Sequence, residues 1–362
     1  MPGPLHGLTI IEMAGIGPAP FAAMMLADHG AQVIRVEREG LIGIPNDPLL
    51  RSRRSIALDL KTEAGRAIVR KLADRADGLI EGYRPGVMER LGLGPAELLM
   101  DNPKLVYGRV TGWGQGGPLA PAAGHDVNYL AITGLLHGIG PKERPIVPIN
   151  YLADFAGGGM MLAFAMVAAL LAVQRNGDGQ VIDCAMSDGA ALIGALTYGM
   201  KAASLWKDER ESNLLDGGNP AYGVYECADG KFLALGAIEQ QFRDALFEGL
   251  GLSSDAGKDE VGKVISTRAR DEWAMAFDGK DACVAPVLTL EEAPGHPHNR
   301  ARTTFIDLDG VTQPGPAPRF SGSARASPSP PRKAGADGEA ILQELGYSAG
   351  EIDTFRREGT LL

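Results

Sequence analysis

The sequence contains few of the residues that build disulfide frameworks and metal sites. Only three of its 362 residues are cysteines, and Cys184, Cys227 and Cys283 are widely spaced in apolar surroundings. An odd number of cysteines at such spacings predicts neither a disulfide framework nor a zinc site and favours a reducing compartment, the cytoplasm. Metal-ligand spacings, a nucleophile elbow and a P-loop are also missing. We therefore expect acid–base or carboxylate chemistry without a cofactor or a metal.

Positive charge is scarce as well. The formal net charge is -10 at pH 7, whereas a nucleic-acid partner requires a concentrated basic surface to neutralise its phosphates. Basic residues gather only locally, as in residues 51–54 (Arg-Ser-Arg-Arg). The composition thus argues against a nucleic-acid partner and is compatible with a small anionic ligand.

Long apolar runs are nearly absent. Phe155–Val173 lacks charged residues and reaches the length of a membrane-spanning helix. Three glycines lie near its start, and alanine and methionine fill much of it, so we expect a buried core helix and no membrane association. The N-terminus has no basic segment before an apolar core, and no signal peptide is predicted.

Strands alternate with helices along the first part of the chain, and this pattern predicts a doubly wound, Rossmann-like parallel sheet. Gly15-Ile16-Gly17 follows the first strand, but Pro20 replaces the third glycine of a dinucleotide fingerprint, which argues against a nicotinamide or flavin. The expected strands are 8–13, 32–36, 55–60, 78–82 and 104–111, and the expected helices are 19–28, 62–76, 95–101 and 128–137.

A second, smaller α+β domain is expected after the breaker at residues 216–220. A hairpin turns at Asp229-Gly230 between the apolar stretches of 224–235, and the proline-rich segment 314–331 is typical of an extended linker. The predicted domains are a large α/β domain, formed by residues 1–205 and 315–362 together, and a small α+β domain, residues 215–310.

Two groups are candidates for proton transfer. His125 follows a glycine, precedes an acid and begins a predicted helix, and Asp154 precedes three consecutive glycines. A packing histidine and a simple helix N-cap are the alternatives for these two residues. Glu239 follows an apolar strand, so we expect it to be partly buried and to need a partner such as a histidine.

Several motifs in combination resemble the racemase branch of the family III CoA-transferases (CaiB/BaiF superfamily). The resemblance spans nearly the whole chain. Its motifs are residues 12–18 (EMAGIGP), 36–38 (VER), 81–87 (EGYRPGV), 112–115 (GWGQ), 124–129 (GHDVNY), 154–159 (DFAGGG), 215–218 (LDGG) and 316–320 (PAPRF).

The resemblance implies racemisation at the α-carbon of a 2-methylacyl-CoA thioester, by proton transfer through an enolate and without a cofactor. It implies that His125 serves one face of that carbon, that Asp154 serves the other, and that Glu239 orients His125. Members of this family are interlocked homodimers, so Glu239 is expected to come from the second subunit.

The resemblance also implies where CoA binds. Backbone amides at or near Asp126 are our hypothesis for the donors to the enolate oxygen. The residues expected to contact CoA are Arg38, Leu58, Lys61, Gly82, Tyr83, Arg84, Arg90, Gly124, Asp126, Val127, Asn128 and Tyr129.

Two other functions are compatible with these residues. In a CoA-transferase of the same fold, Asp154 would attack an acyl-CoA and form a mixed anhydride. His125 argues against this, because a transferase needs no second base there. A CoA-binding protein without catalysis is the third possibility.

Overall fold

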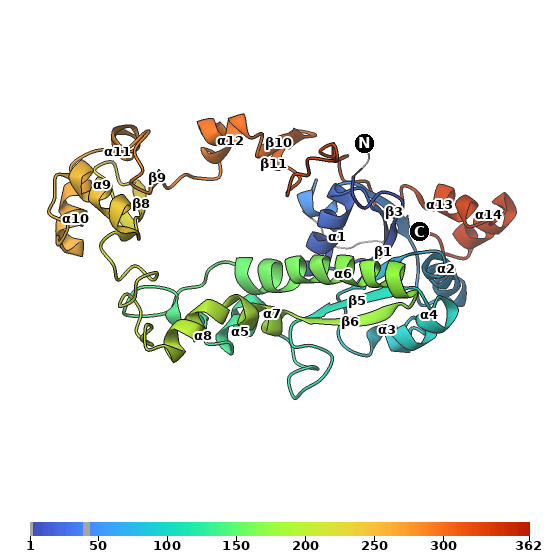
Figure 1. The fold of residues 1–362 in the computed structure, drawn as a ribbon. Helices are drawn as coiled ribbons and strands as arrows, with labels where there is room; N and C mark the ends of the chain where they lie inside the picture. The colour runs from blue at the N-terminus through green and yellow to red at the C-terminus, as the bar shows by residue number, and fades with distance from the viewer. Residues whose placement is uncertain (1–2, 39–43) are drawn as a thin grey trace. The chain divides into compact units, whose positions relative to one another are not determined.

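A six-stranded parallel sheet forms the centre of the computed structural model, which describes residues 3–38 and 44–362 (Figure 1). Its strand order, β3-β2-β1-β4-β5-β6, is that of a dinucleotide-binding fold. The predicted doubly wound sheet is confirmed. The strands are β1 (Thr9–Met13), β2 (Gln32–Glu37), β3 (Arg53–Ala57), β4 (Gly78–Glu81), β5 (Val106–Thr111) and β6 (Gln180–Ala185).

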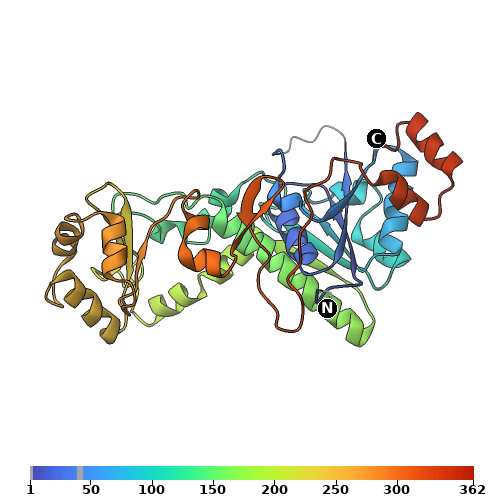
Figure 2. The ribbon, with the colours of Figure 1, turned by 90° about the horizontal axis from the view of Figure 1, so that it is seen from above.

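Helices cover both faces of this sheet (Figures 1 and 2). On one face, Met166 of α6 packs over Gly78 and Gly108, where an added Cβ would lie within 2.7 Å of its side chain. On the other face, Ile68 of α2 and Ile341 of α13 share one core cluster. The helices of these two layers are α1 (Pro18–Asp28), α2 (Glu63–Asp74), α3 (Val87–Arg90), α4 (Pro95–Asp101), α6 (Met161–Asn176), α13 (Gly338–Glu344) and α14 (Ala349–Arg357).

Asp154 lies in a π-helical segment, η3 (Tyr151–Met160), which continues directly into α6. π-Helical backbone is rare and occurs often at functional sites. The glycines of this segment allow close packing, since a Cβ on Gly157 would lie 2.6 Å from the nitrogen of Ala190 in α7 (Met186–Ile193). A Cβ on Gly159 would lie 2.7 Å from the ring of Phe21.

Together η3 and α6 form a helix, Tyr151–Arg175, long and apolar enough to cross a membrane by length and composition alone. Only 44% of its most apolar window is buried. Phe164 is 69% exposed, and Met160, Val167 and Leu171 are also exposed. The predicted core helix is therefore buried along one side only.

The helix that begins after His125 is shorter than predicted. α5 covers Asp126–Ala131, and the chain then turns at Gly134, whose φ of +79° lies in the left-handed region. A glycine adopts this conformation without steric strain and ends the helix there. A short 3-10 turn, η2 (Leu136–Gly138), follows.

The described chain divides into two compact units. The first runs to Thr133 and continues with 149–193 and 303–362, and the second contains Gly134–Pro148 and Gly194–Arg302. The first unit also holds η1 (Pro48–Leu50) and the hairpin β10 (Phe305–Leu308) with β11 (Val311–Pro314). The domain boundaries drawn from the sequence stay a prediction.

An antiparallel sheet of three strands and several short helices build the second unit, and the hairpin expected at Asp229-Gly230 is present between β7 and β8. Its core includes Trp273, Phe247 and Leu233. The elements are α8 (Ala195–Ala202), β7 (Tyr222–Glu226), β8 (Phe232–Gly236), α9 (Gln240–Leu250), α10 (Lys258–Ile265), α11 (Arg270–Ala276), β9 (Val284–Pro286), η4 (Ala293–Gly295) and α12 (Pro297–Ala301).

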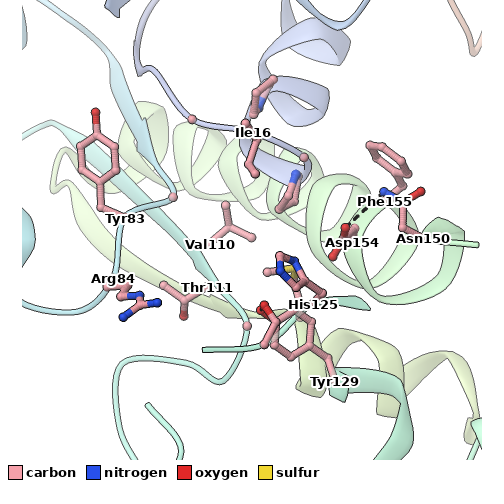
Figure 3. A pocket seen from close by; sticks show the side chains of 18 of the residues that line it. Ile16, Tyr83, Arg84, Val110, Thr111, His125, Tyr129, Asn150, Asp154 and Phe155 are labelled. Atoms are coloured by element: carbon pink, nitrogen blue, oxygen red, sulfur yellow. Dashed lines mark hydrogen bonds between the residues drawn. The ribbon is translucent and has the colours of Figure 1, made fainter. Parts of the chain in front are cut away.

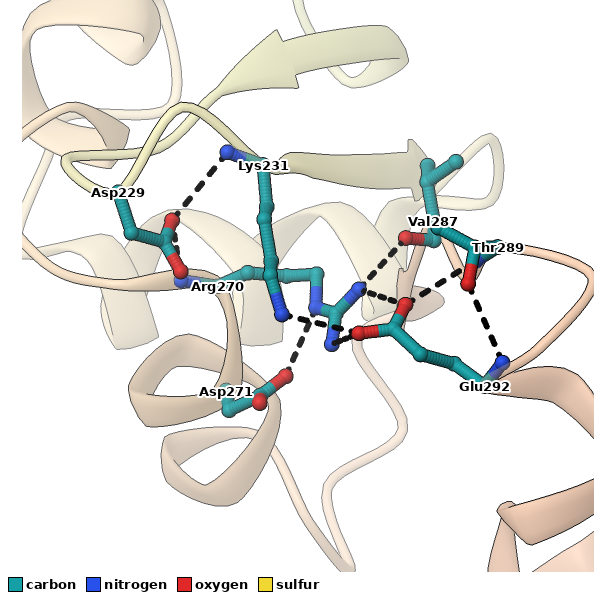
Figure 4. Close-up of polar contacts among 7 residues, drawn as sticks. All are labelled: Asp229, Lys231, Arg270, Asp271, Val287, Thr289 and Glu292. Carbon is teal, nitrogen blue, oxygen red and sulfur yellow. Dashed lines mark hydrogen bonds and ion pairs between the residues drawn. The ribbon is translucent and has the colours of Figure 1, made fainter.

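A buried arginine fastens the segment that follows β9 (Figure 4). Arg270 donates to both carboxylate oxygens of Glu292, to Asp271 and to the backbone carbonyl of Val287. Lys231 makes a further ion pair with Glu292 at 2.9 Å. These contacts anchor the chain before it leaves the second unit.

The close packing of η3 predicts the effect of one added methyl group. A Cβ on Gly189 would lie 1.9 Å from the carbonyl oxygen of Gly157, so Gly189→Ala forces the two backbones apart. We expect a loss of about 1–3 kcal/mol in the free energy of unfolding, measured in urea. The matched control is Gly350→Ala in α14, where a Cβ meets nothing within 4 Å. Equal stabilities of the two variants would contradict this account of η3.

Candidate active site

A cavity of about 720 Å³ lies at the carboxyl edge of the parallel sheet. The loops that follow β1, β4 and β5 supply Gly15–Pro18, Gly82–Pro85 and Gly112-Trp113. Further lining residues come from β2, the segment around η1, the loop before His125, the starts of α5 and η3, and α7. Ligands of open α/β sheets bind at this edge. The side chains of His125 and Asp154 both line the cavity and lie near one another (Figure 3).

His125 is the N-cap residue of α5, and its backbone N–H donates to the side-chain oxygen of Asn128 at 3.1 Å. Its ring is exposed to the cavity. Tyr129 supports the same turn, because its hydroxyl donates to the carbonyl oxygen of Gly124 and its ring occupies the space that a Cβ on Gly112 would need. The glycines before His125 thus make room for this ring.

Asp154 is half-buried and lies on the fourth residue of η3. The helix begins at Tyr151 after Asn150, so the alternative that Asp154 is an N-cap is wrong. Burial raises the pKa of the Asp154 carboxyl; a hydrogen bond from Asn150 lowers it, the charge of Asp126 raises it, and the charge of His125 lowers it. The net shift of this pKa is upward, which favours the protonated form of the carboxyl relative to an exposed aspartate.

Asp126, directly after His125, is buried, and its Oδ2 accepts hydrogen bonds from the backbone N–H groups of Ala153 (2.7 Å) and Asp154 (2.8 Å). Its Oδ1 has no hydrogen-bond partner among the described residues. The first turns of α5 and η3 are therefore joined through this carboxylate.

The cavity brings together seven of the residues predicted from the sequence, and the rest lie elsewhere. Arg38, Lys61 and Arg90 are exposed and do not line it. Leu58 is fully buried in the core, and its backbone N–H donates to the carbonyl oxygen of Glu37. Asp126, Val127 and Asn128 belong to α5 but do not line the cavity. The predicted residues that line it are Gly82, Tyr83, Arg84, Gly124, His125, Tyr129 and Asp154.

Glu239 belongs to the second unit and is the N-cap residue of α9. Its side chain is exposed, so the expectation of partial burial is wrong for this chain. Glu239 lies in the turn between the end of β8 and the start of α9, outside the apolar strand. Its pairing with His125 stays a prediction.

Sequence reasoning missed some residues of the cavity. Asn150 donates to Asp154 at 3.2 Å, and its position four residues before an acid on a helix was the available signal. Thr111 Oγ1 and Trp113 Nε1 are buried without a partner among the described residues, and both residues line the cavity. No sequence pattern identifies such unpaired atoms.

No group of three or more His, Cys, Asp or Glu side chains within residues 3–38 and 44–362 is arranged to hold a metal ion. The family model of CoA-transferase family III matches residues 5–338.

The chain therefore belongs to CoA-transferase family III.

Comparison with individual relatives gives the same family. The chain is 46% identical to the α-methylacyl-CoA racemase of Mus musculus and 44% identical to that of Homo sapiens. Each alignment covers 96% of this chain and 95% of the relative. A crystal structure of a CaiB/BaiF family protein from Brucella suis superposes with a TM-score of 0.82 at 27% identity, covering 95% of this chain and all of the other.

The raised pKa of Asp154 predicts a stability effect with a defined sign. When the pKa of a carboxyl is higher in the folded than in the unfolded chain, ionisation of that carboxyl destabilises the folded chain. The destabilisation is complete at pH values above the pKa of the folded state and disappears in acid. We expect Asp154→Asn to raise the melting temperature at about pH 8 and this gain to shrink as the pH falls towards about 4.

The matched control for this prediction has the opposite sign. Although burial opposes it, hydrogen bonds from Asn213 and from backbone N–H groups lower the pKa of Asp216. Asp216→Asn should therefore lower the melting temperature near neutral pH, and the loss should shrink in acid. A destabilised Asp154→Asn variant at about pH 8 would contradict the raised pKa.

Proposed function

We propose that this protein is an α-methylacyl-CoA racemase, which interconverts the (R) and (S) epimers of 2-methylacyl-CoA thioesters. The observation that carries the proposal is the presence of an imidazole and a carboxyl with a raised pKa, His125 and Asp154, on the wall of one cavity. The identity to the mouse and human racemases supports it. Racemisation needs two such groups, since a proton leaves one face of the carbon and another returns to the opposite face.

In this mechanism one group removes the α-proton and the other protonates the enolate. In the reverse direction the roles exchange, so each group has to be stable in both protonation states. A thioester α-proton is far less acidic than either group, so the enolate oxygen needs a donor in a fixed position. We propose a backbone N–H at the start of α5, that of Asp126 or of a neighbouring residue, and a donor of this kind contributes about 3–4 kcal/mol. No cofactor enters these steps.

The CoA moiety is proposed to extend from this centre along the loop after β4. Gly82, Tyr83 and Arg84 line the cavity, and Figure 3 shows the side chains of Tyr83 and Arg84. The guanidinium of Arg84 is suited to a phosphate. The exposed cations Arg38, Lys61 and Arg90 are proposed to add charge for the remaining phosphates.

The test is incubation with (R)- and (S)-2-methylacyl-CoA in deuterated water, followed by NMR. We expect both epimers to exchange the α-proton and to converge on one epimer ratio, because the two groups serve opposite faces. His125→Ala and Asp154→Ala should each lower the rate by about 10²–10⁴-fold, the usual effect of losing a general acid or base.

The outcome that would replace this proposal is the activity of a CoA-transferase, the other chemistry of the family. A transferase would exchange no α-proton, and in the presence of a carboxylate acceptor hydroxylamine would trap an acyl group on Asp154. CoA binding without exchange or trapping, unchanged by both alanine variants, would identify a binding protein.

We further propose that the protein is an interlocked homodimer located in the cytoplasm, with Glu239 of one subunit orienting His125 of the other. The exposed residues Met160, Phe164, Val167 and Leu171 follow one another at helical spacing on one face of η3 and α6. Contiguous exposed apolar patches on a protein surface can mark an interaction site. A second copy of the chain is the partner that the family resemblance implies.

Light scattering tests the dimer. The purified protein should have twice the chain mass of 38.1 kDa, and Phe164→Glu should shift it towards the monomer, because a carboxylate would be buried in an apolar interface. Met100→Glu is the matched control, since Met100 is 75% exposed on α4 and lies outside this face. A monomeric wild-type protein would disprove the proposed assembly.

A further inference from the structure

We infer that the side chain of Asp126 is a positioning residue that fixes Asp154 relative to His125. This inference rests on the proposed function. It concerns the carboxylate of Asp126, which does not line the cavity, and is separate from the role proposed for its backbone N–H. Asp126 therefore affects the substrate indirectly, by setting the positions of His125 and Asp154.

The contacts of Asp126 join the two acid–base groups by a short path. Asp126 follows His125 in the chain, and its Oδ2 accepts from the backbone N–H groups of Ala153 at 2.7 Å and Asp154 at 2.8 Å. Only the peptide bond and one side chain thus separate the backbone of His125 from that of Asp154. The residue is 3% exposed, so water does not compete for these hydrogen bonds.

The two N–H groups belong to the first turn of η3, whose amides have no partner within the helix. A carboxylate at such an end satisfies them and interacts favourably with the helix dipole. Asn150, in contrast, donates to the side chain of Asp154. Asp126 therefore holds the backbone of Asp154, and Asn150 selects the direction of its carboxyl.

Fixed separation matters because proton transfer requires both groups to reach one carbon atom from opposite faces. Reacting atoms have to approach to about 3–3.5 Å, and a displacement of about 1 Å costs on the order of 10²-fold in rate. A residue that sets the distance between the two groups therefore affects turnover more than affinity.

The charge of Asp126 has a second, separable effect. Its Oδ1 is buried without a hydrogen-bond partner among the described residues, and no described ion pair includes Asp126. Two contributions raise the pKa of Asp154: burial, which is the larger, and the charge of Asp126. Removing the charge should lower that pKa.

The other groups around Asp154 do not cancel this effect. His125 and Tyr129 face it from α5, and Asn150 precedes it in the chain. From α7 the nearest acid is Asp188, which is exposed. In α1 the acid is Asp28 at the far end, where Arg51 binds it.

Two substitutions separate position from charge. Asp126→Asn keeps an oxygen at the same distance from the backbone and removes the charge, whereas Asp126→Glu keeps the charge and displaces the oxygens by one methylene. We expect Asp126→Asn to retain kcat within about tenfold and to shift the acidic limb of the kcat/KM profile to lower pH. Asp126→Glu should lower kcat by about 10²-fold with KM little changed and leave that limb in place.

The matched control is the same pair of substitutions at Asp77. Its Oδ2 accepts from the backbone N–H of Thr9 at 2.8 Å, at the start of β1 and at the opposite edge of the sheet from the cavity. Asp77→Asn and Asp77→Glu should change the melting temperature without moving the pH profile or kcat. Circular dichroism verifies that each variant is folded.

The outcomes distinguish this inference from the proposed function. A wild-type protein that exchanges no α-proton contradicts the racemase. If the wild type exchanges, wild-type kcat in Asp126→Glu overturns the positioning role, and an unmoved acidic limb in Asp126→Asn overturns the electrostatic one. Should Asp126→Glu fail to fold, Asp126→Ala replaces it, and full kcat in that variant equally overturns the positioning role.

Discussion

The first unit depends on how closely the segment that carries Asp154 approaches its neighbours. Gly157 and Gly189 place the backbones of η3 and α7 in direct contact, and Gly159 lets α1 approach from another side. Any side chain at these positions would push η3 outward and move Asp154 with it. The three consecutive glycines are therefore a packing requirement, and close-packed interiors tolerate little displacement.

Buried carboxylates in this unit fall into two groups. Glu12 pairs with Arg35 and Arg53, and Glu81 pairs with Arg109 at 2.8 Å, so their charges are compensated close to the cavity. Asp154 lines the cavity and Asp126 binds its backbone N–H, and neither has a cation in a described ion pair. Uncompensated burial costs stability, and such a cost is usually retained where it serves a function.

The sequence predicts the sheet well because its buried strands are short and rich in apolar and β-branched residues, as in β1, and because glycine and proline lie near their ends. It also identifies His125 and Asp154 by their neighbours. It does not predict that Asp154 lies inside a π-helical turn, that Asn150 reaches it, or that Glu239 is exposed. These features depend on contacts between segments distant in the chain, which local patterns do not encode.

The surroundings of Asp154 also bear on the choice between racemase and transferase. A nucleophilic carboxylate works best ionised, held by donors or cations that lower its pKa, whereas an acid–base carboxyl has to exchange its proton near neutral pH. Burial raises the pKa of Asp154, and the neighbouring charge of Asp126 acts in the same direction. The single hydrogen bond from Asn150 and the charge of His125 only partly oppose them. This balance supports proton transfer, and Asp126 is the residue through which the fold maintains it.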